Sequence, residues 1–359
     1  MIAHSKGSYD PARPASLRPA PLRSGDRVAV IAPCSPFPQD RFERGLAALG
    51  SIGLQAAVPA GLDARFPPGE AAYLAGDDAH RLEQLRAALG DESARAIILA
   101  RGGYGLLRLA SQLSASEFSA RPRLLCGYSD ATVLHELSAR AGVPSIHGPM
   151  CTQLGEDQSA LARLRALLCG EPPGAIAWEP MHPAGARPAG LDEDRARSAQ
   201  LGDDRSSPAR LGEGRVEGIL RGEGRTEGVL RGGNLAVLAS LCGTALSPRF
   251  SGCILLLEDL NEPPYRLDRL LTQLLLAGAL DGVRGVVVGD LSAAGEPGAG
   301  RAEAVLERLS GLAVPIAFGA PFGHAGRNQP VAFGVPHALD AAAGTLTPLD
   351  SPTSPRATG

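Results

Sequence analysis

The stretch RPRLLCGYSDATVLHELSARAG (residues 121–142) contains the unit from which we derive the fold. Its apolar start is short and ends in a glycine turn, as in a buried strand, and the residues from Ala131 onward have helical periodicity. The same order recurs at residues 94–113, where ARAIILARGGYG is followed by LLRLASQL. Repeated strand–turn–helix units predict an α/β fold, with a parallel sheet covered by helices.

Shifts in composition divide the chain into two predicted α/β domains with irregular segments around them. Residues 1–25 are rich in Pro, Ser and Arg and lack the apolar core of a signal peptide, so we predict a disordered lead-in. The first α/β domain is predicted over residues 26–170. Residues 171–222 lack periodicity, which predicts a linker that is expanded into a flexible insertion. A second α/β domain at 223–349 and a tail at 350–359 complete the prediction.

A tandem repeat ends this insertion: EGRVEGILRG (213–222) is followed directly by EGRTEGVLRG (223–232). We interpret the duplication as slippage of a repetitive coding segment. The second copy continues into GNLAVLASLCG. We therefore predict that only the second copy forms a functional strand and turn.

The composition is typical of a soluble globular protein. The chain has 359 residues, of which 44% are hydrophobic, and a net charge of −3, so a nucleic-acid partner has no electrostatic support. No apolar run is long enough to cross a bilayer. Six cysteines without a CxxC pair are typical of a reducing compartment. We predict a cytoplasmic protein with no nucleic-acid and no membrane partner.

Lysine is almost absent from the sequence, and this excludes several kinds of chemistry. The one lysine is Lys6, which lies in the predicted lead-in. P-loop phosphate binding, Schiff-base catalysis and Ser-Lys dyads all need a positioned lysine, so none of them is expected.

Ser129 lies in the turn between the strand and the helix of residues 121–142. Such a turn exposes the hydroxyl group and directs the amides that follow it, with the helix dipole, at one point, which suits a developing oxyanion. The motif differs from the hydrolase elbow G-x-S-x-G because Ala131 replaces the last glycine. Ser129 is therefore either a nucleophile or a simple serine at a helix start, where serine is common.

A serine nucleophile needs a base, and a third group must orient that base. Two of the seven histidines, His147 in SIHGPM and His324 in FGHAGRNQP, lie in loops just past short apolar runs. Glu258 ends the apolar run CILLLE, where a buried carboxylate needs a partner. That partner is either a histidine ring or an arginine, and Arg266 and Arg269 are near in sequence.

Ser129, Glu258 and His324 thus follow predicted strands, at the edge where α/β sheets bind their ligands. The glycine turn RGGYG (101–105) would supply unhindered amides for an oxyanion. It could instead bind an anion such as phosphate, although the G-x-G-x-x-G spacing is missing.

The motifs together resemble the LD-carboxypeptidase family of serine peptidases, also called muramoyltetrapeptide carboxypeptidases. The matching segments span most of residues 27–340 in order: VAVIAPCSP, ARGGYG, GYSDATVLH, HGPM, LRGGNLAVLASLCGT, LLLEDLNEPPYRLDRLLTQL and FGHAGRNQPVAFG. The resemblance implies a flavodoxin-like N-terminal domain that carries the serine, and a smaller C-terminal α/β domain that carries the acid and the histidine. The active site would lie at the interface of the two domains.

By the same resemblance, Ser129 would be the nucleophile, His324 the general base and Glu258 its orienting acid. The backbone amides of Gly103 and Asp130 would form the oxyanion hole. The implied reaction is hydrolysis of the L,D-peptide bond that releases the terminal D-alanine of murein tetrapeptide in cell-wall recycling. It needs no metal and no cofactor.

A carboxypeptidase must also recognise a free carboxylate, and Arg101 and Arg327, each beside a catalytic loop, are our candidates for that contact. One branch of the family cleaves aminoacyl-nucleotide antibiotics such as microcin C, and Trp178, the single tryptophan, lies near where that branch would bind a base. Outside the family, the alternative is a non-catalytic anion-binding α/β protein. We expect a homodimer, the commonest symmetric assembly.

Overall fold

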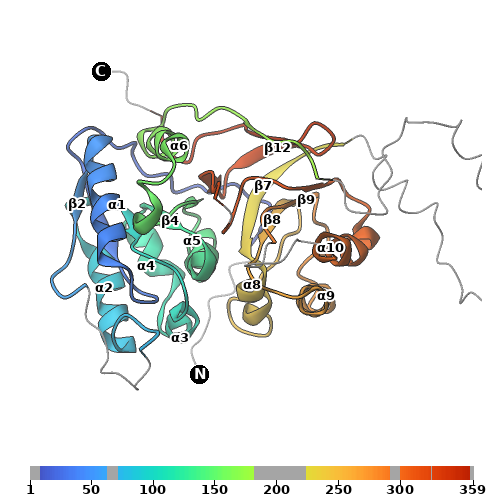
Figure 1. Cartoon of the computed structure of the whole chain (residues 1–359), viewed down its shortest axis with the longest axis horizontal. Coiled ribbons are helices and arrows are strands. Elements are labelled where there is room, and N and C mark those ends of the chain that lie inside the picture. Colours follow the sequence, from blue (N-terminus) through green and yellow to red (C-terminus); the bar gives the residue numbers. More distant parts are fainter. Residues whose placement is uncertain (1–8, 63–71, 182–223, 292–299, 325, 356–359) are drawn as a thin grey trace, which may run out of the picture.

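The first of two β-sheets is built mainly by the N-terminal half of the chain. The computed structural model describes residues 9–62, 72–181, 224–291, 300–324 and 326–355 (Figure 1). The parallel strands of this sheet are β1 (Arg27–Ile31), β2 (Gln55–Ala57), β3 (Ala94–Leu99), β4 (Leu124–Gly127) and β5 (Ser145–His147). Their order in space, β2-β1-β3-β4-β5, is that of flavodoxin-like folds. The predicted fold of the first domain is confirmed.

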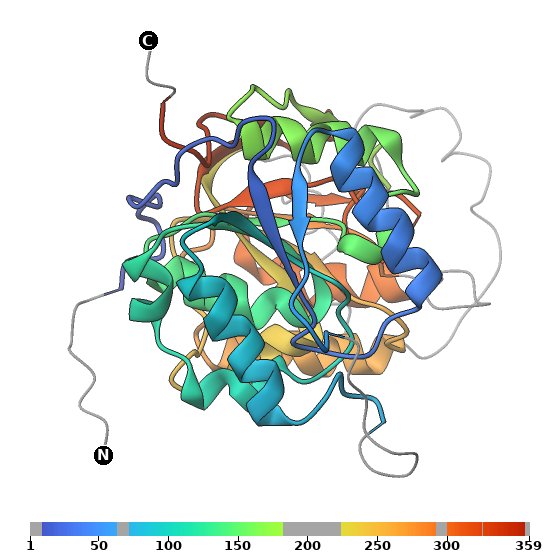
Figure 2. The same ribbon diagram turned by 90° about the vertical axis from the view of Figure 1, so that its left-hand side faces the viewer.

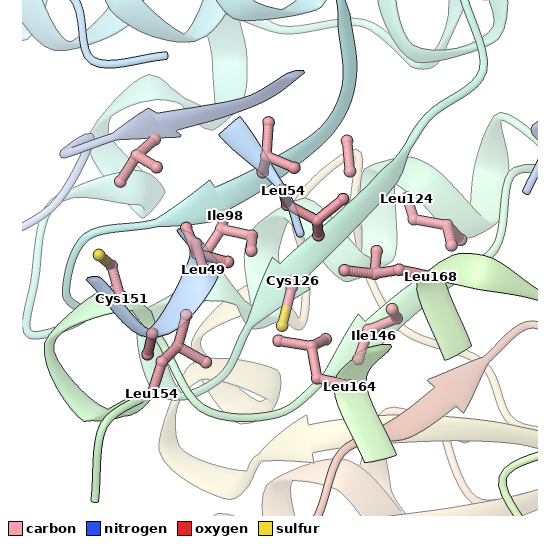
Figure 3. Packing of buried hydrophobic residues seen from close by; sticks show 14 of the residues in the cluster. Leu49, Leu54, Ile98, Leu124, Cys126, Ile146, Cys151, Leu154, Leu164 and Leu168 are labelled. Carbon is pink, nitrogen blue, oxygen red and sulfur yellow. The ribbon is translucent and has the colours of Figure 1, made fainter. Parts of the chain in front are cut away.

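Helices cover both faces of this sheet because its strands are apolar on both sides. The helices are α1 (Gln39–Ser51), α2 (Asp78–Gly90), α3 (Leu106–Leu109), α4 (Ala115–Ala120), α5 (Thr132–Arg140) and α6 (Gln158–Cys169), with 3-10 turns η1 (Ala110–Gln112) and η3 (Cys151–Gln153). α1 and α6 pack on one face and α2 to α5 on the other, so α1 and α2 lie on opposite sides of β1 and β2 (Figure 2). In Figure 3, Leu164 and Leu168 of α6 lie against Cys126 and Ile146 of the sheet.

The second sheet is mixed and forms the second lobe of the molecule. Its strands are β6 (Ile176–Ala177), β7 (Arg225–Asn234), β8 (Cys253–Glu258), β9 (Gly285–Val288), β10 (Ile316–Phe318), β12 (Pro336–Asp340) and β13 (Thr345–Pro348). β7 to β10 are parallel, and the antiparallel strands β12, β13 and β6 extend the sheet beyond β7. The lobe also contains α8 (Leu235–Leu241), α9 (Pro264–Leu276), α10 (Arg301–Leu309) and η4 (Ser310–Leu312). The predicted α/β class of the second domain is confirmed.

Two strands change the simple division into consecutive domains. β11 (Val331–Phe333), from the C-terminal part of the chain, pairs antiparallel with β5 and completes the first sheet. Its side chains alternate: Ala332 lies in the core of the first sheet, while Val331 and Phe333 lie in a core of the second. β6, within the predicted linker, adds an edge strand to the second sheet. The two cores therefore share a strand.

The structure describes only the second copy of the tandem repeat, apart from its first residue. The second copy forms most of β7, which confirms that this copy supplies a strand. The first copy, with most of the predicted insertion, lies outside the described residues.

The prediction of a disordered lead-in is wrong for residues 9–25, which pack against both lobes. The amide of Ala15 donates to Gly334 O at 2.7 Å, and that of Leu22 donates to Leu168 O at 2.9 Å. Arg18 forms an ion pair of 2.6 Å with Asp350, at the start of the predicted tail. No helix among the described residues is long and apolar enough to span a membrane.

A buried ion pair joins the two lobes, where α5 faces β7 (Figure 1). Arg231 on β7 lies 2.9 Å from Glu136 on α5, and their side chains are 4% and 1% exposed. The guanidinium group also lies over the ring of Tyr9, 5.0 Å from its centroid. Burial raises the pKa of the Glu136 carboxyl to about 7. Removing only one partner of such a pair leaves a buried charge without its counterion.

We expect Arg231→Met to lower the free energy of unfolding by about 3–5 kcal/mol, because Glu136 remains buried without its ion-pair partner. The double variant Glu136→Leu/Arg231→Met should regain much of that loss, since the carboxylate that Arg231 would leave without its ion pair is then removed as well. Urea titration of the native protein, the single variant and the double variant measures the loss of stability and its recovery. A double variant as unstable as the single one would show that the ion pair is not what the single variant disrupts.

Candidate active site

Ser129 occupies a sharp turn at the carboxyl end of β4. The strand ends at Gly127, and Ser129 begins a single 3-10 turn, Ser129–Ala131, that leads directly into α5. The φ angle of Ser129 is 61°, in the left-handed region that a side chain with a Cβ rarely adopts. The predicted strand-to-helix turn is confirmed, and its backbone is strained in the manner of a nucleophile elbow.

The second lobe contacts this turn directly, through Thr132. Its Oγ1 donates to Ser129 O at 2.7 Å and accepts from the amide of Asn234 at 3.0 Å. Gly233, with φ of 136°, makes the approach possible, because a Cβ at this position would lie 2.4 Å from Thr132 Oγ1. The GGN sequence at the end of β7 therefore fixes the position of the serine turn.

Glu258 and His324 are joined by a hydrogen bond at the end of β8. The side chain of Glu258 is fully buried, and its Oε2 lies 2.7 Å from Nδ1 of His324. Gly323 has φ of 103°, and a Cβ there would lie 2.9 Å from Glu258 Oε2. Only a glycine lets the loop bring the imidazole this close to the carboxylate.

The arginine alternative for Glu258 is wrong. Arg266 pairs with Glu262 at 2.8 Å, and Arg269 lies over the ring of Tyr265. The acid at the end of β8 is therefore paired with a histidine of its own lobe.

Burial and neighbouring charges act in opposite directions on the pKa values of Glu258 and His324. Burial alone would raise the pKa of the Glu258 carboxyl, but the neighbouring imidazoles of His147 and His324 outweigh it and lower that pKa to about 2. Burial also disfavours a charged His324, yet the hydrogen bond and the negative charge of Glu258 raise its pKa above the ordinary value of 6.5. An ionised acid beside a histidine of increased basicity is suited to proton transfer.

Ser129 and His324 line one cavity of about 660 Å³ between the lobes. Gly103 and Arg101 of the glycine turn line it from the first lobe, and Asn234 lines it from the second. The ring of His324 lies beside that of Tyr128, with their centroids 4.8 Å apart. Within the described residues, no group of three or more His, Cys, Asp or Glu side chains is arranged to hold a metal ion.

His147, the other histidine candidate, does not line this cavity. It is fully buried at the end of β5, and its Nε2 lies 4.0 Å from Oε1 of Glu258, the oxygen that His324 does not contact. A histidine in that position cannot meet a substrate, so it is not the base.

The two predicted oxyanion amides lie on neighbouring loops. In the described part of the chain, neither Gly103 N nor Asp130 N donates a hydrogen bond to the protein. The buried carboxylate of Asp130 accepts from the amide of Leu106 at 2.9 Å and so ties the serine turn to the glycine turn. The family resemblance implies a role only for the amide of Asp130, so this role of its side chain could not be read from the sequence.

Arg101 and Arg327 lie beside different cavities. Arg101 lines the cavity of Ser129, and its Nη1 donates to Pro36 O at 2.7 Å. Arg327 lines an adjoining cavity of about 1400 Å³, together with Trp178. Glu156 and Asp157 line both cavities, which makes the two spaces neighbours.

Comparison with known sequences gives consistent matches along the chain. Residues 28–148 match the LD-carboxypeptidase N-terminal domain, and residues 227–339 match the LD-carboxypeptidase C-terminal domain. A Streptomyces coelicolor protein named as a carboxypeptidase is 38% identical over 94% of this chain and 97% of its own length. The murein tetrapeptide carboxypeptidase of Pseudomonas aeruginosa is 30% identical over 86% of this chain and 91% of its own.

Solved structures agree with the architecture. The muramoyltetrapeptide carboxypeptidase of Oxalobacter formigenes superposes with a TM-score of 0.67 at 25% identity, over 91% of this chain and 100% of its own. An MccF-like protein of Bacillus anthracis superposes with a TM-score of 0.72 at 21% identity, over 92% and 99% of the two chains. The second likeness shows the shared fold alone.

The strain at Ser129 predicts that glycine is the more stable replacement. Ser129→Gly should exceed Ser129→Ala in free energy of unfolding by about 1 kcal/mol, because glycine adopts positive φ without steric cost. Urea titration of both variants measures the difference. Equal stabilities, or a less stable glycine variant, would mean that the turn is not strained at this residue.

Proposed function

The chain belongs to the LD-carboxypeptidase family, and on that premise we propose that it is a serine peptidase that releases the terminal D-alanine from murein tetrapeptide. The observation that carries the proposal is the 2.7 Å contact between His324 Nδ1 and Glu258 Oε2, with His324 and Ser129 lining one cavity. A serine with an oriented imidazole is the arrangement that acyl transfer requires.

In the proposed reaction, the hydroxyl oxygen of Ser129 attacks the carbonyl carbon of the L,D-peptide bond. Because Nδ1 of His324 donates to Glu258, its Nε2 is free to take the serine proton. The amides of Gly103 and Asp130 stabilise the oxyanion of the tetrahedral intermediate. His324 then protonates the departing amine of D-alanine, and water hydrolyses the acyl-enzyme by the same groups.

The terminal carboxylate of the substrate must lie close to the scissile bond. We assign its recognition to Arg101, because its side chain lines the catalytic cavity and a guanidinium group can bind a carboxylate through two hydrogen bonds. Arg327 lines the adjoining cavity, so we assign it to a more distant part of the peptide.

We place this reaction in the cytoplasm, in peptidoglycan recycling, and expect a homodimer. The six cysteines are all free in the structure, in keeping with a reducing compartment. Closed symmetric dimers are the commonest assembly of soluble enzymes.

The direct test is release of D-alanine from purified murein tetrapeptide. Ser129→Ala should lower kcat by about 10³–10⁶-fold and leave substrate binding intact, because only the nucleophile is lost. A coupled assay for free D-alanine measures the rate, and equilibrium binding of the peptide to the variant provides the control.

Three results would contradict the proposal. Hydrolysis of an aminoacyl-adenylate analogue but not of the tetrapeptide would place the chain in the antibiotic-immunity branch. Unchanged turnover in Ser129→Ala, or binding without any turnover by the native protein, would remove Ser129 as the nucleophile.

The charge of Glu258 predicts the direction in which its loss moves the titration of His324. Since Glu258 raises the pKa of His324, Glu258→Gln should lower that pKa, and the ring should become neutral at lower pH than in the native protein. The variant should also lose about 10⁴-fold in kcat, because an amide can stabilise the wrong tautomer. NMR titration, with the resonance assigned through His324→Gln, measures the shift. An unchanged or raised pKa would contradict the pairing.

A further inference from the structure

One oxygen of the buried Glu258 carboxylate and a buried histidine face each other without other partners. Within the described residues, Glu258 Oε1 and both ring nitrogens of His147 make no hydrogen bond. The side chains of both residues are 0% exposed, and Nε2 of His147 lies 4.0 Å from Oε1. Buried polar atoms of native proteins almost always have a partner, so two facing ones need an explanation.

The surroundings of His147 offer no alternative partner in the part of the chain that the structure describes. Its ring lies against the aromatic rings of Tyr128 and Phe333, at centroid distances of 5.8 Å and 5.4 Å. The nearby ring of His135 already bonds to Ser145 Oγ and to Gly127 O. The Glu258 oxygen is thus the polar atom that faces this imidazole.

The distance between the two atoms decides how they interact. At 4.0 Å the two atoms are beyond direct hydrogen-bond distance, and both side chains are fully buried. A direct hydrogen bond requires an approach of about 1 Å, which small torsional changes of the two side chains supply. Nε2 can donate a proton in one neutral tautomer and in the charged ring alike.

We propose that His147 is a positioning residue of the catalytic acid: its Nε2–H donates to Oε1 of Glu258 and holds the carboxylate while Oε2 accepts from His324. The inference rests on the proposed function. His147 belongs to β5 of the first lobe, whereas Glu258 and His324 belong to the second. The acid is therefore held from both lobes, and it points correctly at His324 only when they are docked.

Loss of the donor has a specific consequence for catalysis. Without it, Oε1 remains buried with no partner, and the carboxylate can turn toward other donors. His324 then loses its fixed orientation toward Ser129. A misplacement of a catalytic group by about 1 Å can reduce turnover strongly. Substrate binding should change little, because His147 does not line the catalytic cavity.

The test compares two substitutions of the same residue. We expect His147→Leu to lower kcat by about 10–100-fold with KM within twofold, and His147→Gln, which keeps an N–H donor, to recover most of the loss. Phe333→Leu is the matched control, since it alters packing against the same ring but removes no donor. It should lower stability while kcat stays within about twofold.

A second measurement separates this proposal from the proposed reaction. The Nδ1 proton that His324 shares with Glu258 should give a downfield NMR resonance in the native protein without substrate. This resonance should broaden or shift upfield in His147→Leu and persist in His147→Gln. An unchanged resonance in His147→Leu, or equal losses of kcat in both His147 variants, would overturn the positioning role. If the native protein hydrolyses no tetrapeptide, the proposed reaction fails while the resonance still decides the role of His147.

Discussion

A carboxylate with no access to water is the constraint around which this molecule is organised. Glu258 is fully buried, and an ionised group in that position is destabilising unless donors surround it. Its requirement for donors explains why a glycine precedes His324, since any larger residue would keep the imidazole away from the carboxylate. Its hydrogen bond and its negative charge also explain why the pKa of His324 lies above that of a free histidine, although burial of the ring acts in the opposite direction.

The second requirement is that the two lobes stay in fixed relation, because the serine and its base come from different sheets. Apolar packing of α8 against α5 contributes to this, and short polar contacts add to it. Thr132 joins the serine turn to the end of β7, and the Glu136–Arg231 pair joins α5 to the same strand. Gly233 at the end of β7 lets that strand approach the side chain of Thr132, which a Cβ at this position would prevent.

Local sequence signals predicted the parts of the site that depend on one strand and the turn that follows it. The turn of Ser129, the buried acid at the end of β8 and the glycine loop of His324 could all be read from short motifs. Contacts between distant segments could not be read in this way. The carboxylate of Asp130 reaches the amide of Leu106, and the pairing of β11 with β5 joins segments far apart in the chain. Residues 9–25 resembled a disordered tail because their composition does not reveal the surfaces on which they pack.

β11 carries a consequence for how such a protein can evolve. Its alternate side chains enter two different cores, so the first lobe depends on a C-terminal strand to complete its sheet and its interior. Recombination that replaced the C-terminal half of the gene with that of an unrelated enzyme would leave the first sheet without the strand that pairs with β5. We therefore expect this architecture to diversify in its loops and insertions, with the two halves inherited together.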